Sequence, residues 1–158
     1  MSDIETRLKN PFPANAVHWR VGSTTKDKSK GTALAYLNAR DVMKRLDEVV
    51  GMENWKDCYA ETPSGRTICT LKLRIDGEWI GKTDGAGDTN VEGEKGAISD
   101  AFKRAAVKWG IGRYLYYLPA KWVEIDQYRK IQNPPQLPKW ALPKDTSGEK
   151  SANLEGWQ

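Results

Sequence analysis

The sequence predicts an α+β fold, in which an antiparallel β-sheet with a hairpin packs against helices. Apolar and polar side chains alternate from Arg66 to Ile75, which is the period of a β-strand. The dipeptide Asp76-Gly77 follows and is a strong signal for a two-residue hairpin turn. Two longer stretches, 32–50 and 89–110, instead repeat apolar residues at helical spacing. A chain of 158 residues fits a single domain of this class.

The N-terminal third is predicted to contain one short strand and one helix. A short amphipathic segment ends near Pro11, and residues 17–21 alternate well enough for a strand. The polar run 22–31 predicts a loop, and the helix of 32–50 stops at Gly51, a residue favoured just past a helix end. The buried stripe of this helix is predicted to consist of Ala35, Ala39, Val42, Leu46 and Val49. On its opposite face, Arg45 is interpreted as a solvated partner of Asp41 at i, i+4 spacing.

The middle of the chain is predicted to form three strands. Residues 55–61 form the first, and a turn at 63–65 leads into the alternating strand. One face of that strand carries Cys69, Leu71, Leu73 and Ile75. Residues 78–83 return after the hairpin turn, which places Arg74 opposite Trp79. This pair is either ordinary packing or a platform for a nucleic-acid base.

The second helix is predicted to begin near Thr89, which forms a capping box with Glu92, and to end at Gly110. The Gly/Asp-rich connection before it, residues 83–90, lacks the spacing of a P-loop or a dinucleotide-binding turn. The core stripe of the helix is predicted to be Ile98, Ala101, Phe102, Ala105 and Trp109. The opposite face gathers Asp100, Lys103, Arg104 and Lys108.

The composition changes near residue 127, and we divide the chain there. Residues 1–126 are expected to form the domain, and residues 127–158 a Pro-rich arm and a tail. Four of the eight prolines lie between Pro134 and Pro143, where no helical or strand period survives. Beyond Lys144 the composition predicts disorder.

Composition disfavours several function classes. No apolar run approaches the ~20 residues of a membrane span. Cys58 and Cys69 lack CxxC spacing and His18 is the single histidine, which argues against a disulfide framework, a zinc site or a Ser–His–Asp triad. The first residues lack the apolar stretch of a secretory signal, so we expect a cytoplasmic protein, and we expect no cofactor.

Charge is distributed in blocks. Residues 20–45 hold seven basic and two acidic residues, and residues 95–113 hold five basic residues against one acid. Residues 46–94, between them, hold eleven acidic and five basic residues. Two basic blocks suit a polyanionic partner if the fold brings them together, and are otherwise ordinary solvated surface.

Nucleic acid is the polyanion that the basic residues fit best. Lys103 and Arg104 are adjacent on the second helix and can grip neighbouring phosphates, while Arg40 and Lys44 lie one turn apart on the first. Lys95, Lys108 and Arg113 are flanking candidates. No zinc finger, helix-turn-helix or RNP motif is present, so binding to the backbone is expected rather than sequence-specific readout.

A metal-dependent nuclease is the enzymatic alternative. Asp84, Asp88, Glu92 and Glu94 are close enough in sequence to hold Mg²⁺. No Lys or His accompanies them in a nuclease pattern, and the glycines between them fit a turn before a helix N-terminus, where acids are favourable.

Two segments carry a resemblance to a known family. ALAYLNARDVMKRLDEVVGMENW (33–55) and TDGAGDTNVEGEKGAISDAFKRAAVKWGIGRYLY (83–116) are similar to the Rad52 family of single-strand annealing proteins, most closely to its short phage and prophage members, the Sak-type proteins. The resemblance covers roughly residues 15–125, and SDAFKRAAVKWG at 99–110 is its most specific part.

The resemblance implies a function and an assembly. Family members form rings or helical homo-oligomers, with single-stranded DNA in a positive groove, its backbone inward and its bases outward. By position, Lys103 and Arg104 match the basic pair of that groove. A groove arginine on the earlier helix falls on Asp41, beside Arg40, and a further basic position falls on Val107.

The expected function is therefore ATP-independent binding and annealing of single-stranded DNA in recombination and repair, by a homo-oligomer acting as a phage-type recombinase. The expected partners are single-stranded DNA, further copies of the chain, and a host single-strand-binding protein or phage exonuclease. The main alternative is a protein that protects single-stranded DNA ends without annealing. A metal-dependent nuclease comes next, and a structural oligomer with an unused basic face comes last.

Overall fold

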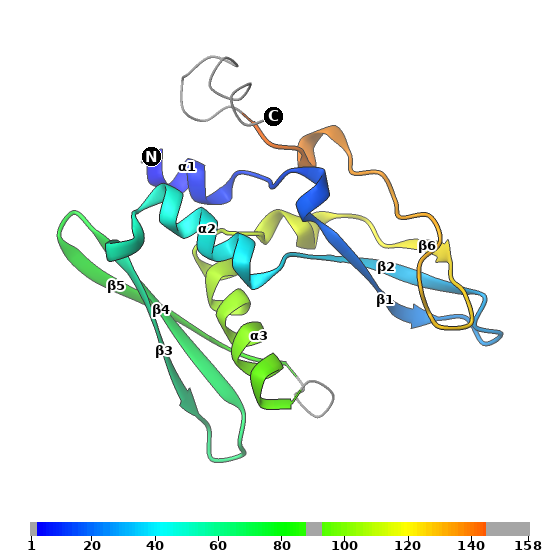
Figure 1. The fold of residues 1–158 in the computed structure, drawn as a ribbon, viewed down its shortest axis with the longest axis horizontal. Coiled ribbons are helices and arrows are strands. Elements are labelled where there is room, and N and C mark those ends of the chain that lie inside the picture. The colour runs from blue at the N-terminus through cyan, green and yellow to red at the C-terminus, as the bar shows by residue number, and fades with distance from the viewer. Residues whose placement is uncertain (1–2, 88–92, 145–158) are drawn as a thin grey trace.

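A computed structural model describes residues 3–87 and 93–144, except for the side chains of 93–95. Within these residues, two three-stranded antiparallel sheets and three α-helices form one body, with α3 (Gly93–Lys108) between the sheets (Figure 1). The predicted α+β class is confirmed. None of the helices described is both long and apolar enough to cross a membrane.

The first sheet has the strand order β1-β2-β6, formed by β1 (His18–Thr24), β2 (Lys30–Tyr36) and β6 (Lys121–Glu124). The predicted strand at 17–21 is thus confirmed and longer, and the polar loop shrinks to the residues between Thr24 and Lys30.

The prediction of a helix over 32–50 is wrong at its start. Residues 30–36 are the central strand of the first sheet, and α2 (Ala39–Val49) begins only after them. Strand β2 pairs with β1 on one side and with β6 on the other, so its backbone N–H and C=O groups are hydrogen-bonded within the sheet. This pairing outweighs the helical spacing of its apolar residues. The β1 strand approaches so closely that a side chain at Gly31 would meet the Val21 Cγ1 atom at 2.6 Å.

Asp27 orders the loop between β1 and β2. Its Oδ1 atom accepts hydrogen bonds from the Thr25 hydroxyl at 2.8 Å, and from the Ser29 amide at 3.0 Å and hydroxyl at 2.7 Å. These donors, with the Ser29 hydroxyl first, lower the pKa of Asp27 from 3.8 to about 2.

We expect the Asp27 carboxyl to titrate near pH 2 in a carboxyl-carbon NMR titration of the folded protein. Because this pKa is lowered by folding, the loop gains stability that is fully present above the unfolded pKa of 3.8 and is lost as the pH falls through about 2. A midpoint near 3.8 would show that these hydrogen bonds do not persist in solution.

The second sheet matches its prediction closely. It has the order β3-β4-β5, formed by β3 (Trp55–Glu61), β4 (Thr67–Ile75) and β5 (Glu78–Gly85). Asp76 and Gly77 both have positive φ, 52° and 82°, as a type I′ hairpin turn requires. Arg74 pairs with Trp79 as predicted.

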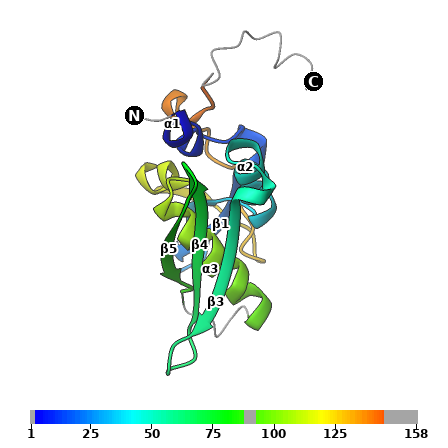
Figure 2. The same ribbon diagram turned by 90° about the vertical axis from the view of Figure 1, so that its left-hand side faces the viewer.

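Helix α3 covers one face of this sheet (Figure 2). Cys69, Leu71 and Leu73 of β4 are fully buried against it, and the Trp109 indole N–H donates to the Leu71 carbonyl at 3.0 Å. The buried face of α3 consists of Ala97, Ala101, Phe102, Ala105 and Ala106. Small alanines let the helix approach the strands closely.

The predicted core stripe of α3 is wrong at one position, Ile98. Ile98 was expected in the core but is 41% exposed, because the helix faces the sheet with its alanines instead. The first described helical residue is Gly93, so the predicted start at Thr89 and its capping box with Glu92 lie outside the described residues.

The N-terminal helix α1 (Asp3–Lys9) is held by Arg45 of α2, which is a correction to the solvated role expected for that residue. The Arg45 Nη1 atom donates to the carbonyls of Arg7, Leu8 and Asn10, and its guanidinium stacks on Phe12 at 3.9 Å from the ring centroid. Burial lowers the pKa of this guanidinium from its ordinary value.

The arm after β6 returns to α1. The Asn10 side chain accepts a hydrogen bond from the Lys144 amide and donates one to the Lys144 carbonyl, at 2.9 and 2.8 Å. Ala141, in the 3₁₀ turn η4 (Lys139–Ala141), is fully buried. The disorder expected beyond Lys144 concerns residues outside those described.

Candidate nucleic-acid interface

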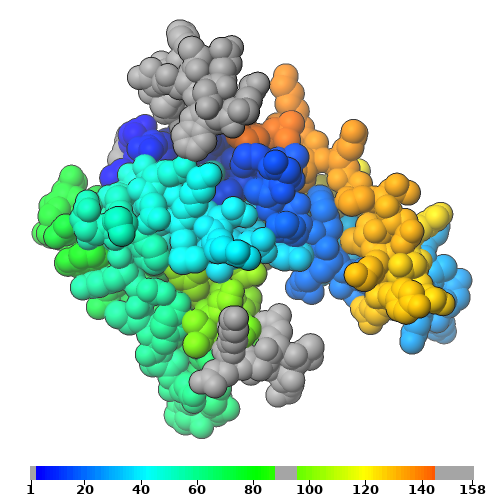
Figure 3. All heavy atoms as spheres, viewed as in Figure 1, coloured from blue at the N-terminus to red at the C-terminus, as the bar shows by residue number. Residues whose placement is uncertain are grey.

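A cavity of about 520 Å³ opens between α3 and the first sheet. Its third wall is the 3₁₀ helix η3 (Arg113–Tyr117) and the residues that follow it. The surface is indented here, below α2 and between α3 and the strands β1 and β2 (Figure 3). The polar and aromatic side chains that line the cavity include Trp19, Arg20, Tyr36, Lys103, Arg104 and Tyr116.

Lys103 and Arg104 of α3 both line this cavity, as does Asp100 one turn earlier. The Lys103 Nζ atom lies 5.4 Å from the ring centroid of Tyr36, the last residue of β2. A cation over an aromatic face is attracted to it without losing its charge. The Tyr36 ring therefore supports the Lys103 ammonium from the opposite wall.

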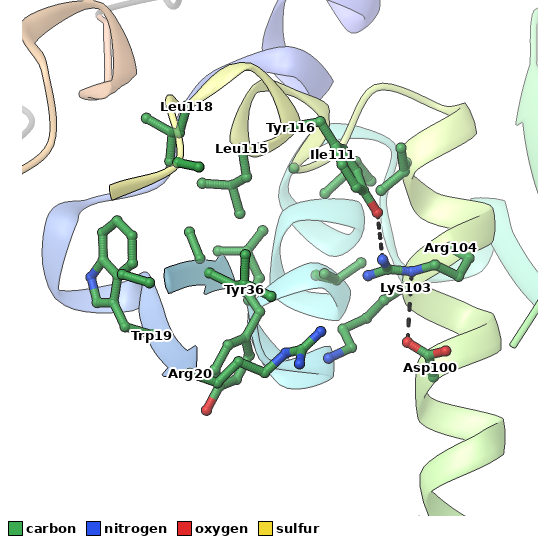
Figure 4. Close-up of a pocket in the computed structure, with 18 of the residues that line it drawn as sticks. Trp19, Arg20, Tyr36, Asp100, Lys103, Arg104, Ile111, Leu115, Tyr116 and Leu118 are labelled. Atoms are coloured by element: carbon green, nitrogen blue, oxygen red, sulfur yellow. Dashed lines mark hydrogen bonds and ion pairs between the residues drawn. The ribbon is translucent and has the colours of Figure 1, made fainter. Parts of the chain in front are cut away.

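Arg104 is held in place from two sides (Figure 4). Its Nη1 atom donates to the Tyr116 hydroxyl, and its Nε atom lies 3.7 Å from Asp100 Oδ1. The other Asp100 oxygen accepts the Gly87 amide at 2.9 Å, which ties α3 to the residues after β5. These contacts fix the guanidinium and leave most of its five donors available to an anion.

The Nε atom of Arg104 is also a buried donor without a hydrogen-bond partner among the described residues. Buried donors are rarely left unsatisfied, and exceptions often belong to functional sites. Because this Nε atom is buried and faces Asp100 at 3.7 Å, it serves to orient the guanidinium and does not itself reach an anion in the cavity.

Arg20 of β1 is the cavity residue that sequence reasoning missed. It is exposed, and its guanidinium and the Lys103 ammonium point toward one another from opposite walls (Figure 4). Arg20 opens the first basic block of the sequence, which was the available signal. Nothing in the sequence places β1 beside α3, so its partnership with Lys103 was not predictable.

The cavity thus gathers three cations from two separate elements against one acid, Asp100. Such an arrangement gives the cavity an excess of positive charge, which attracts anionic partners. All of the residues named above lie between positions 19 and 116.

The part of the chain that holds the cavity is similar to known proteins. Residues 1–133 match the Rad52/22 family of double-strand break repair proteins. The chain belongs to this family. The resemblance drawn from residues 33–55 and 83–116 is confirmed, and every cavity residue falls within the matched part of the chain.

Two similar proteins are known from Deinococcus, both named single-stranded DNA-binding protein DdrA. The chain is 41% identical over 157 residues to the D. deserti protein, across 98% of this chain and 77% of that one. It is 38% identical over 146 residues to the D. radiodurans protein, across 90% and 69%.

The other basic candidates of this Rad52/22 family chain lie elsewhere. Arg40 and Lys44 are exposed on α2 and do not line the cavity. Lys108 turns to β5, where it donates to the Thr83 carbonyl. Arg113 donates to the carbonyls of Val107 and Lys108, at 3.1 and 2.8 Å, which caps the end of α3. The side chain of Lys95 lies outside those described.

At two positions, 41 and 107, the chain lacks a basic residue that the family pattern has. Val107 lines the cavity, whereas Asp41 does not. Arg20, from a different element, contributes the guanidinium opposite Lys103.

The carboxylates of the nuclease alternative are only partly described. Asp84 Oδ1 accepts the Gly85 amide at 2.7 Å. Asp88, Glu92 and the side chain of Glu94 lie outside the described residues. Within the described part of the chain, no group of three or more His, Cys, Asp or Glu side chains is arranged to hold a metal ion.

Proposed function

We propose that this protein binds single-stranded DNA in the cavity between α3 and β1, and anneals complementary strands without ATP. The observation that carries the proposal is the convergence of Arg20, Lys103 and Arg104 on one cavity. Membership of a double-strand break repair family and the names of the two Deinococcus relatives support it.

The cations act on the DNA backbone. Lys103 and Arg20 face one another across the cavity and bind phosphates from both walls, while Arg104 is pre-oriented by Asp100 and Tyr116. Phosphate contacts position a strand but carry no sequence information. With its backbone inward, the strand turns its bases outward, where a complementary strand can read them.

Annealing then needs no covalent step. Neutralising the phosphates of the bound strand lowers its repulsion toward a second strand. Base pairing supplies both the specificity and the favourable free energy, so that no nucleotide hydrolysis is required. The protein contributes by holding the bases exposed and the backbone extended.

We infer that several copies act together, in a ring or helical homo-oligomer. One cavity of about 520 Å³ is too small to hold the length of strand that a stable hybrid needs. The described surface exposes large aromatic side chains, which are typical of protein contacts: Tyr117 is 71% exposed, Trp122 54% and Tyr128 72%.

The test is a titration of a labelled single-stranded oligonucleotide at several salt concentrations, followed by its complement. We expect binding to weaken with salt at a slope of roughly −0.7 per phosphate contacted. Duplex should then form faster than without protein, in the absence of nucleotide. No binding at moderate salt would refute the proposal.

End protection without annealing is the second candidate, because both relatives are named for single-strand binding alone. It predicts that the bound strand resists a 3′ or 5′ exonuclease while its complement pairs no faster than in free solution. The same titration separates the two functions.

The Arg20→Gln variant tests whether β1, on the wall of the cavity opposite α3, contributes to DNA binding. Loss of one cationic phosphate contact should weaken binding about tenfold and reduce the salt slope by about 0.7. Fluorescence anisotropy with an oligo-dT probe measures both quantities. Arg40→Gln is the matched comparison, since Arg40 is exposed outside the cavity, and its affinity should stay within about twofold of wild type. Equal losses in the two variants would argue against the cavity.

A further inference from the structure

The second sheet separates its charges between its two faces. Neighbouring residues of a strand point to opposite faces, so the pairing register assigns each side chain to one of them. Lys56 pairs with Lys72, and Arg74 with Trp79, in the register that faces away from α3. The acidic residues of the sheet all occupy the other register, in which they pair with buried or inward-facing residues of β4. These acids, on β3 and β5, are Asp57, Glu61, Glu78 and Asp84.

The face turned away from α3 is therefore purely basic among its charged side chains. We call the surface formed by Lys56, Lys72, Arg74 and Trp79 the outer face. None of the ion pairs among the described residues involves one of its three cations. Arg74 donates to the Asn54 side chain at 2.8 Å, which orients its guanidinium without neutralising it.

An indole ring lies at the centre of the outer face. Trp79 is 39% exposed, although large aromatic side chains are usually buried. The Lys56 Nζ atom lies 4.3 Å from its ring centroid, and the Arg74 Cζ atom lies 5.3 Å from it. Across the strands from Lys72 stands Gly81, so no larger side chain covers the sheet between that lysine and the edge strand β5.

The outer face is separated from the cavity by the sheet and by α3. Figure 2 shows the sheet in front of the helix, with the face that carries these residues turned to the viewer. In Figure 1 the first sheet lies on the other side of α3. The two basic surfaces therefore lie on opposite sides of one helix, so a strand held in the cavity leaves the outer face uncovered.

We propose that the outer face binds a second segment of single-stranded nucleic acid, with a base stacked on Trp79 and phosphates on Lys56, Lys72 and Arg74. Stacking on an exposed aromatic ring beside a row of cations is the chemistry of sequence-tolerant single-strand binding. An acidic peptide would use the cations but has no need of the indole ring. The inference rests on the proposed function, because it gives the incoming complementary strand a place on the same protein.

The test removes the two sites separately in the full chain. In the Arg20→Gln/Lys103→Gln/Arg104→Gln background, which lacks all three cations of the cavity, the remaining binding of oligo-dT should come from the outer face. Adding Trp79→Ala should weaken that remaining binding about tenfold, which corresponds to ~1.4 kcal/mol, and Trp79→Phe should restore most of it. Lys82→Gln is the control, since Lys82 lies on the same strand in the opposite register and packs over Trp109.

The wild-type background gives the second readout. Trp79→Ala alone should leave the affinity for a first strand within about twofold, since the cavity dominates it, while slowing annealing about tenfold. Two results would overturn the proposal that the outer face binds nucleic acid, and both would leave the proposed function intact. One is a wild-type annealing rate for Trp79→Ala; the other is that Trp79→Ala does not weaken the binding that remains in the variant without the cavity cations. If the wild-type protein binds no single-stranded DNA, both the proposed function and the outer-face proposal are wrong.

Discussion

Replacing Lys103 and Arg104 together with glutamine is expected to weaken single-stranded DNA binding about 100-fold at moderate salt. The two side chains supply two of the three cations of the cavity, from adjacent positions of α3. Two lost phosphate contacts should also reduce the salt slope by about 1.4. Anisotropy titrations of oligo-dT at three salt concentrations measure both effects.

The fold should survive this double substitution, because both side chains are partly exposed and face a cavity rather than the core. Circular dichroism and thermal melting check this directly. Lys108→Gln is a matched control on the same helix, since the Lys108 ammonium reaches the Thr83 carbonyl and not the cavity. A folded double variant with wild-type affinity would show that the cavity is not the DNA site.

Replacing Arg45 with alanine is expected to lower the free energy of unfolding by about 3 kcal/mol. Its guanidinium donates to three carbonyls near the end of α1 and stacks on Phe12, so its loss leaves several acceptors unpaired. For a chain of this length, the melting temperature should fall by roughly 6–12 °C. Differential scanning calorimetry measures the shift.

Arg40→Ala is the control for stability, since Arg40 is exposed on the same helix. Its melting temperature should change by less than about 2 °C. Limited proteolysis adds a local readout, because the N-terminal helix should be released first in the Arg45 variant. Equal melting temperatures for the two variants would contradict the role of Arg45 as the anchor of α1.

The second sheet could be predicted because its signals are local. The alternation of β4 and the Asp76-Gly77 turn fix both the register and the buried face within twenty residues of sequence. This register also places Trp79 opposite Arg74, a pairing that the structure confirms. The basic outer face follows from the same alternation, although the side that α3 covers is known only from the fold.

The first sheet could not be predicted in the same way. Residues 30–36 are small and apolar enough to fit either a helix or a strand, and their pairing partner β6 begins 85 residues after Tyr36. Long-range pairing of this kind leaves no local signal. For the same reason the sequence suggests a solvated Arg45, whereas the packing of α1 across α2 turns it into an anchor.

The α+β class, the hairpin register, and the choice of Lys103 and Arg104 as a basic pair that could bind phosphates all follow from the amino-acid sequence. These features depend on residues that are close together in the chain, so the spacing of residue types is enough to predict them. The packing of α3 against the first sheet brings Arg20 opposite Lys103, and it places Asp100 and Tyr116 beside Arg104. The same packing leaves four other basic candidates outside the cavity: Arg40, Lys44, Lys108 and Arg113. These placements could not be read from local sequence, because a binding surface forms where separate elements pack, and the free energy of that packing comes from buried side chains scattered along the whole chain.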